Sequence, residues 1–243
     1  MSDNKWIRYI NNNHESSKRI IVFPHAGGSA NYYTELLNNN INAECIGIQY
    51  PGRQDRIFED NLDSIEALST NIYKELLKLE KKETVFFGHS MGALVAFELI
   101  KKFYNDIQFV KLLILSSSCP NYYDDKIDST KDLFKYLYEL GGTEKEALLC
   151  HRQQLEDLVL PTIKNDLLIS KKYKLKKQSC KISIPIQVFV GNTDYDVKNH
   201  CQHWGKYTTH YLGEKYFKVI CTPNFGQMNL RFEVLFYEIF KKR

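Results

Sequence analysis

The sequence predicts an α/β fold in which a mostly parallel sheet is flanked by helices and a helical segment is inserted late in the chain. Three observations favour this fold. Short apolar runs alternate with longer stretches of helical periodicity, glycine or proline follows several of the apolar runs, and residues 120–181 show only helical periodicity. We expect one domain over residues 1–243, with residues 120–181 as an inserted helical lid over the strand ends, where open α/β sheets bind their ligands.

Each expected strand is a short apolar run bounded by turn-forming or polar residues. The first run stops at Pro24 and the second at Pro51, because proline cannot donate to a sheet ladder. The expected strands lie within residues 18–23, 45–50, 84–88, 110–118, 184–194 and 215–223. The segments between them carry apolar residues at helical spacing. The expected helices lie within residues 31–40, 64–80, 93–104, 129–142, 143–174 and 228–243.

The composition is that of a globular protein with a sizeable core: 243 residues, 43% hydrophobic and 13% aromatic. The net charge of +4 comes without a nucleic-acid-binding motif, so nucleic acid is not expected as a partner. The polar amino-terminal segment does not resemble a signal peptide, and no apolar run approaches the roughly 18 residues of a membrane helix. Six scattered cysteines without a CxxC pair indicate reduced, buried thiols. We expect a cytoplasmic monomer that does not bind membranes.

The clearest motif is Gly-His-Ser-Met-Gly at residues 88–92, a G-x-S-x-G pattern. The pattern alone is weak evidence, because a small-residue helix start without chemistry has the same composition. Here it follows an apolar strand and opens a helix, which is the context of a nucleophile elbow. We therefore expect Ser90 to be a nucleophile held clear of the sheet on a strained turn.

An acyl-transfer serine needs two N–H donors for the oxyanion that forms when it attacks a carbonyl. The amide of Met91, directly after the serine, is the first candidate. The loop Phe-Pro-His-Ala-Gly-Gly-Ser at residues 23–29 is suited to supply the second, because its glycines let the backbone approach a ligand closely. Within that loop we select Ala26, although an ordinary glycine-rich turn remains the alternative.

Five motifs occur together in one order: FPHAGGSANYY, IQYPGRQDR, FGHSMGALVAFEL, YELGGT and IPIQVFVGNTD. In this order the chain resembles the type II thioesterases, stand-alone α/β-hydrolases that accompany nonribosomal peptide and polyketide synthases. The resemblance covers nearly the whole chain. It implies hydrolysis of acyl or aminoacyl thioesters on the phosphopantetheine arm of an acyl or peptidyl carrier protein, with no metal and no cofactor beyond the arm that the substrate carries. It also places His25 and Gly27 beside the substrate, although the match of His25 to the family's own histidine indicates a structural role.

The catalytic acid on this fold follows a late strand, and the catalytic histidine comes after it. The resemblance favours Asp194, three residues after Gly191; Asp196 is close enough to take the role, and a turn-forming aspartate without a catalytic role is the alternative. The position that matches the histidine is Gln227. A neutral amide cannot accept the proton of a serine hydroxyl near pH 7.

Three interpretations of Gln227 stay open: natural divergence toward slow turnover or acyl transfer, a single engineered substitution, and a loop aligned one or two residues out of register. The whole loop departs from the family pattern, at residues 224–225 and 228–229 as well, which favours divergence. A shifted loop could instead bring round His200, His203 or His210, and no histidine follows these. The side chain of His89 is expected to point away from the Ser90 oxygen, and nothing argues for His14 or His151.

The lid is expected to cover the acyl chain. Its apolar positions either line a pocket for that chain or form the core face of the helices, which is the commoner role of such positions: Leu133, Phe134, Leu137, Leu140, Leu155, Leu158 and Leu160. Six lysines near its end form either a docking surface for an acidic carrier protein or a solvated face: Lys171, Lys172, Lys174, Lys176, Lys177 and Lys181. Arg53 and Arg56 are expected to pair with carboxylates at the rim. The hypothesis from another class is a protein that binds acyl-carrier substrates without hydrolysing them.

Overall fold

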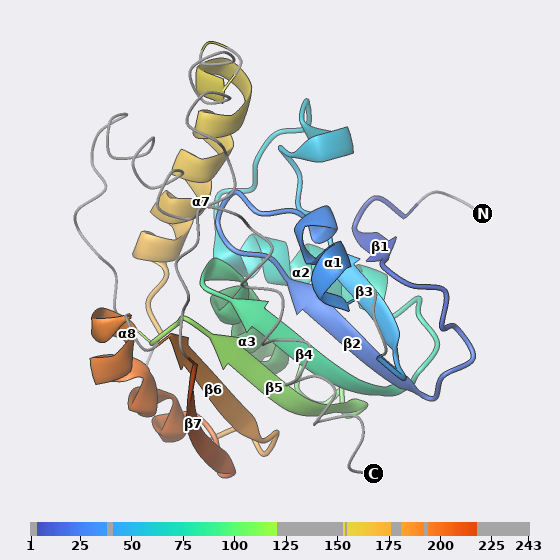
Figure 1. Cartoon of the computed structure of the whole chain (residues 1–243), viewed down its shortest axis with the longest axis vertical. Helices are drawn as coiled ribbons and strands as arrows, with labels where there is room; N and C mark the ends of the chain where they lie inside the picture. Colours follow the sequence, from blue (N-terminus) through green and yellow to red (C-terminus); the bar gives the residue numbers. More distant parts are fainter. Residues whose placement is uncertain are drawn as a thin grey trace.

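Among the residues that the computed structural model describes, 4–37, 41–120, 153, 155–175, 181–191 and 194–217, seven strands form one sheet in the order β1-β3-β2-β4-β5-β6-β7 (Figure 1). Six of them run parallel, and only β1 is antiparallel to its neighbour β3. The predicted mostly parallel sheet is therefore confirmed. The strands are β1 (Ile7–Tyr9), β2 (Lys18–Phe23), β3 (Glu44–Ile48), β4 (Glu83–His89), β5 (Val110–Ser116), β6 (Ile186–Gly191) and β7 (Tyr211–Phe217).

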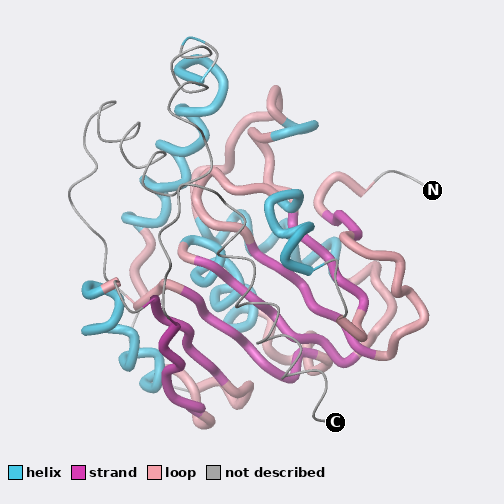
Figure 2. The backbone as a smooth tube through the Cα atoms, viewed as in Figure 1, coloured by secondary structure: helices cyan, strands magenta, loops and turns pink. Residues whose placement is uncertain are grey.

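Helices lie on both faces of this sheet (Figure 2). The helical elements are η1 (Ala30–Tyr33), α1 (Thr34–Leu37), η2 (Gln54–Arg56), α2 (Ile65–Leu76), α3 (Met91–Lys102), the π-turn η3 (Leu155–Val159), α7 (Leu160–Lys172), α8 (Tyr195–His200) and η4 (Cys201–Lys206). The predicted helix over residues 31–40 begins as a 3-10 turn and continues as the four-residue α1. Strand β7 begins at Tyr211, before the predicted residue 215. The rest of that predicted strand, the helix over 228–243 and the lid residues 121–152 lie outside the described residues.

Alternating residues of the central strands divide the core into two layers. Ile21, Phe23, Phe86, Leu113 and Leu115 pack with helices α2 and α3 on one face of the sheet. Their immediate neighbours, including Ile20, Val22, Val85, Phe87 and Ile114, pack with Tyr33 and Leu37 of the η1–α1 segment on the other face. Successive strand side chains point to opposite faces, so a strand buried on both faces needs the continuous apolar runs that the sequence shows.

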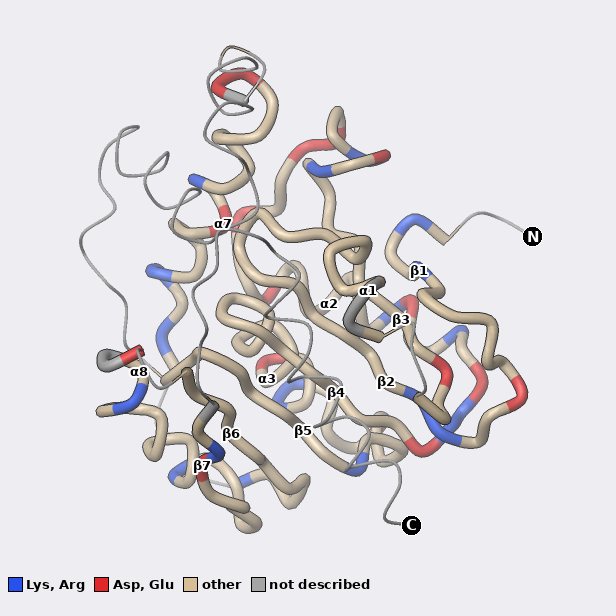
Figure 3. The backbone as a smooth tube through the Cα atoms, in the orientation of Figure 1, with Lys and Arg blue, Asp and Glu red and all other residues tan. Residues whose placement is uncertain are grey.

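Charged residues are nearly absent from the middle of the sheet and gather at its periphery (Figure 3). At the amino end of the parallel strands, the buried carboxylate of Glu44 pairs with Arg19 and with Lys82, whose Nζ lies 3.3 Å from Glu44 Oε1. Burial alone would raise the pKa of Glu44, but these partners and His14 lower it below its usual range. This cluster holds the strand starts together at the end of the sheet away from the strand carboxyl ends.

Helix α7 stands at the opposite end of the sheet, beyond the arrowheads of β4 and β5 (Figure 1). It is the described part of the predicted lid. Thr162 donates to the carbonyl of Gly52 at 2.7 Å, and Asn165 donates to that of Leu62 at 2.8 Å. Near its carboxyl end, Tyr173 donates to the buried carboxylate of Glu98 on α3. Several polar contacts thus fix this helix to the sheet domain.

Three of the six cysteines lie within the described part of the chain. Cys45 and Cys201 are buried free thiols and Cys119 is also buried, whereas Cys150, Cys180 and Cys221 lie outside the described residues. None of the described helices has the length and apolar content to cross a membrane. The described residues also contain no group of three or more His, Cys, Asp or Glu side chains able to hold a metal ion.

Candidate active site

Ser90 occupies a strained turn between β4 and α3. Its backbone angles are φ 51° and ψ −116°, in a region that a side chain rarely adopts. Two hydrogen bonds hold this turn: the Ser90 N–H donates to the carbonyl of Ser116 on β5 at 2.9 Å, and the Ala93 N–H donates to the Ser90 carbonyl at 3.0 Å. The geometry is that of a nucleophile elbow, and it is not that of a simple helix start.

The two glycines of the motif are required by close packing. A Cβ atom on Gly88 would lie 2.5 Å from the Ala93 Cα. A Cβ atom on Gly92 would lie 1.9 Å from the carbonyl oxygen of Phe23, at the end of β2. Both clashes are with backbone, which cannot move aside as a flexible side chain could. The first turn of α3 therefore lies directly against the end of β2 and the loop that follows it.

Replacing Gly92 by Ala is therefore expected to lower the free energy of unfolding by about 2 kcal/mol or more, because the new methyl group forces the elbow away from β2. Urea unfolding followed by circular dichroism measures this loss. Gly205→Ala is the control, since its Cβ would lie 3.2 Å from an adjustable Tyr211 side chain. Equal free energies of unfolding in the two variants would contradict the close contact between α3 and β2.

The loop after β2 lies beside the elbow, because Phe23 and Gly88 are paired in adjacent parallel strands. In this loop the Gly28 N–H donates to the carbonyl of His25 at 2.9 Å, and the Gly27 N–H donates to Asp166 Oδ2 at 2.8 Å. Of the amides of residues 26–28, only that of Ala26 has no acceptor within the described part of the chain. The amide of Met91, at the first position of α3, likewise has no partner within its helix.

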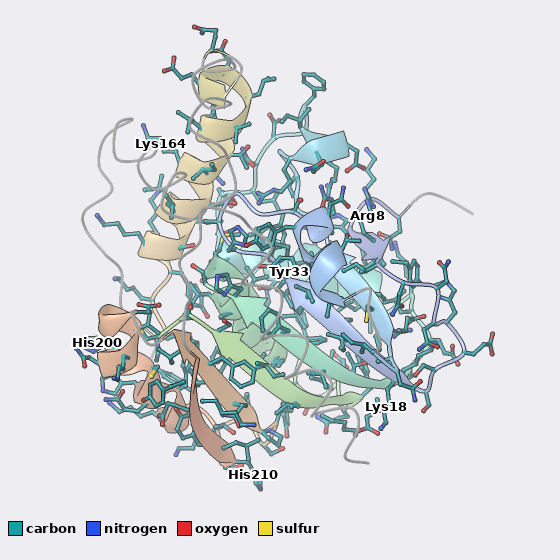
Figure 4. All side chains as sticks on the ribbon, viewed as in Figure 1. Arg8, Lys18, Tyr33, Lys164, His200 and His210 are labelled. Carbon is teal, nitrogen blue, oxygen red and sulfur yellow. The ribbon has the colours of Figure 1, made fainter. Side chains whose placement is uncertain are left out.

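His25 is buried inside this loop. Its Nδ1 lies 2.9 Å from the hydroxyl of Tyr33 (labelled in Figure 4), and its ring packs where a Gly28 side chain would otherwise be. Burial, then the neighbouring His89 and Arg53, lower the pKa of His25 to about 3. The neutral, hydrogen-bonded ring supports the structural role that the family resemblance implies. Its assignment to substrate contact stays a prediction.

His89 is half-buried next to the nucleophile. Its Nδ1 lies 3.0 Å from the hydroxyl of Ser116 on the neighbouring strand, and its ring centroid lies 5.6 Å from that of His25. Burial lowers the pKa of His89 to about 4. A histidine with so low a pKa is mostly neutral near pH 7 and is a weak proton acceptor, so neither ring is suited to serve as the general base.

Asp194 lies just beyond the carboxyl end of β6, where the acid was predicted. Its N–H donates to the Gly191 carbonyl at 3.0 Å, and its Oδ1 accepts from the Val197 N–H at 3.3 Å as the N-cap of α8. This capping contact is also what a purely structural aspartate would make, so the catalytic role stays a prediction. The side chain of Asp196 and the whole of Gln227 lie outside the described residues.

The three late histidines occupy the segment between β6 and β7. His210 precedes the start of β7, which pairs with the start of β6, so it lies at the amino end of the sheet, far from the strand end that carries Ser90 (Figure 4). His200 and His203 lie on α8 and η4, with ring centroids 5.9 Å apart. The described positions therefore give no support to the hypothesis that one of them replaces the missing base.

The lid residues have mixed outcomes. Leu160 is buried, Leu158 is 42% exposed, and the side chain of Leu155 and the four earlier leucine and phenylalanine positions lie outside the described side chains. Among the lysines, Lys171, Lys172, Lys174 and Lys181 are exposed on or after α7, whereas Lys176 and Lys177 are not described.

The expected pairing of the two arginines with carboxylates is confirmed. Arg56 pairs with Glu59 at 2.7 Å. Arg53 forms a buried, two-pronged pair with Asp166 on α7, at 2.8 and 3.1 Å. The sequence analysis did not identify Asp166 as a functional residue. Its spacing could have indicated burial, because Asp166 lies three residues from both Ile163 and Ile169 and so shares their buried face of α7.

Comparison with known proteins identifies a family that matches this chain. A family model described as a thioesterase domain matches residues 18–220. A curated relative, the thioesterase PikA5 of Streptomyces venezuelae, is 31% identical over 214 residues, which cover 84% of this chain and 74% of the relative.

Two solved structures have the same fold. The type II thioesterase BorB from the borrelidin biosynthetic cluster is 24% identical, with a TM-score of 0.76. That match covers 98% of this chain and 96% of BorB. YbtT, a type II thioesterase from the yersiniabactin biosynthetic pathway, is 20% identical, with a TM-score of 0.82 and 97% coverage of both chains. The motif-based resemblance and the α/β-hydrolase fold are thus confirmed.

Proposed function

This chain belongs to the thioesterase domain family, and we propose that it hydrolyses acyl or aminoacyl thioesters carried on the phosphopantetheine arm of a carrier protein in nonribosomal peptide or polyketide biosynthesis. The names of the similar proteins support this pathway class. The observation that carries the proposed reaction is the strained Ser90 turn beside a loop whose Ala26 amide has no acceptor among the described residues.

In the proposed reaction, the Ser90 oxygen attacks the thioester carbonyl carbon. The amides of Ala26 and Met91 stabilise the negative charge on the carbonyl oxygen. The carbon–sulfur bond then breaks, and the thiol of the carrier arm leaves with the proton that the serine gave up. Water attacks the resulting serine ester, releases the acid and restores the serine hydroxyl. The reaction needs no cofactor.

The general base is the part of this reaction that departs from the family pattern. Asp194 is the proposed acid, and Gln227 occupies the proposed place of the histidine that it would orient. Because an amide is not basic near pH 7, we propose slow turnover by this chain, with an acyl-enzyme that lasts longer than in a thioesterase with a complete triad. The second candidate, binding of acyl-carrier substrates without hydrolysis, is favoured only by this glutamine.

The proposal is tested by incubating the protein with an acyl-phosphopantetheinyl carrier protein and following the intact masses of both chains. Loss of the acyl group from the carrier, with release of free acid, is the expected result. A transient or stable mass gain on the enzyme is expected as well, and Ser90→Ala should abolish both changes. If neither mass changes with the wild-type protein, hydrolysis is excluded and the binding function is left.

The exposed lysines of helix α7 support a carrier protein as the partner. Lys164, Lys171 and Lys172 are exposed, and the one acidic residue of the helix, Asp166, is buried against Arg53. Figure 3 marks the basic positions along α7 in blue. The outward face of the described helix is therefore positively charged. Such a face attracts an acidic protein surface and steers its approach.

A further inference from the structure

Asp166 reaches from helix α7 into the loop that carries the proposed oxyanion donor. Its side chain is 2% exposed and accepts three hydrogen bonds, two from Arg53 and one from the Gly27 N–H. A buried carboxylate is stable only when it is paired and hydrogen-bonded in this way. Through Asp166, helix α7 therefore places a buried negative charge against the backbone of this loop, although the helix carries no proposed catalytic group.

Arg53 extends the same network to further points of the backbone. It donates to the carbonyl of Gly28 at 3.1 Å and to that of Pro51 at 3.1 Å. Its guanidinium carbon lies 5.0 Å from the ring centroid of Tyr50, whose hydroxyl donates to the Pro24 carbonyl at 3.3 Å. The loop between β2 and η1 is thus held at Pro24, Gly27 and Gly28 by side chains from outside it.

These contacts determine where the Ala26 amide points. In a trans peptide the C=O and N–H groups are directed oppositely. The His25 carbonyl accepts from the Gly28 N–H, so the Ala26 N–H of the same peptide points away from Gly28. The next peptide is fixed by the Gly27 N–H, which is directed at Asp166. Gly27 has φ 73°, so without this contact its lack of a side chain would allow the peptide to rotate.

We propose that Asp166 is a positioning residue for the oxyanion hole, and that helix α7, by carrying it, couples the lid to the alignment of the Ala26 amide. This inference rests on the proposed function, since it takes Ala26 as an oxyanion donor. The network stabilises negative charge on the substrate only indirectly, by keeping one donor in the orientation that the transition state needs.

The test compares Asp166→Asn with Tyr173→Phe in the acyl-carrier assay, at a temperature where both are folded. Tyr173→Phe removes another polar contact of α7, to Glu98, but none at the loop. Asp166→Asn is expected to lower kcat by about 100-fold with KM changed less than threefold, because a misdirected oxyanion donor affects the transition state. Tyr173→Phe should leave kcat within twofold. If the acyl-enzyme accumulates, the rate of acyl-enzyme formation is compared between the variants in place of kcat.

A second measurement does not depend on activity. Amide hydrogen exchange at Gly27 should be at least tenfold faster in Asp166→Asn than in wild type, and unchanged in Tyr173→Phe. If Asp166→Asn does not fold because Arg53 is left unpaired, the double variant Asp166→Asn/Arg53→Gln removes the buried charge and should show the same loss of kcat.

The outcomes separate the two proposals. Serine-dependent hydrolysis that Asp166→Asn leaves within twofold of wild type would overturn the positioning role and leave the proposed function intact. An equal loss of kcat in Asp166→Asn and Tyr173→Phe would also overturn it, because general loosening of α7 would explain both. Hydrolysis that persists in Ser90→Ala would overturn the proposed function itself.

Discussion

Gln227→His is expected to raise the rate of thioester hydrolysis by at least tenfold. Imidazole can take the serine proton near pH 7 and return it to the leaving thiol, whereas the glutamine amide can do neither. Loss of a triad histidine can cost on the order of a millionfold in turnover, so even partial restoration of the geometry gives a measurable gain. The rate of free-acid release from an acyl-carrier thioester measures it.

Asn229→His is the matched control, because it adds the same side chain to the same loop two residues away. It should leave the rate unchanged, and Ser90→Ala should cancel the gain of Gln227→His. A gain that survives Ser90→Ala would mean that the new histidine catalyses hydrolysis without the elbow. An unchanged rate in Gln227→His would mean that the register of the loop has been misread.

The local parts of the fold and the site could be predicted because each depends on neighbours in the sequence. The strands are continuous apolar runs, and Ser90 lies where a strand changes into a helix across two glycines. Gly88 and Gly92 are fixed by contacts within this turn and with β2. The place of Asp194 follows from the same logic, because the loop after a late parallel strand opens at the same end of the sheet as the elbow, whereas its choice over Asp196 came from the family resemblance and its catalytic role stays a prediction.

The contacts that join distant segments could not be predicted. Arg53 and Asp166 are 113 residues apart, and the sequence indicates only that an arginine at the rim needs some carboxylate. Which carboxylate it meets depends on where α7 lies over the sheet. Strand β1 was missed because its three residues, Ile7–Tyr9, are too few to show an alternating pattern.

Lowering the pH is expected to destabilise the protein well before its carboxylates are protonated. The pKa values of His25 and His89 are lowered from 6.5 to about 3 and about 4, mainly by burial. Between pH 6.5 and these values the unfolded chain binds more protons at both positions than the folded chain does. Above pH 6.5 these two groups do not lower the free energy of unfolding. Below pH 6.5 the free energy of unfolding decreases as the pH is lowered.

The expected loss from these two groups is roughly 3 to 4 kcal/mol between pH 7 and pH 5, which is a large part of the stability of an ordinary domain. Urea unfolding at half-unit pH steps measures it. Carboxylates such as Glu59, whose pKa is lowered to about 2 by hydrogen bonds from Arg56 and Lys5, add to the loss mainly below pH 5. The window from pH 5 to 6.5 therefore isolates the histidines.

One variant isolates the contribution of His89. His89→Gln should remove about half of the slope in this window, because one of the two histidines with a strongly lowered pKa is gone. The wild-type protein, measured in the same buffers, is the reference. A slope unchanged from wild type would show that His89 does not resist protonation in the folded protein. The elbow would then be more open to solvent than its packing against His25 and Ser116 implies.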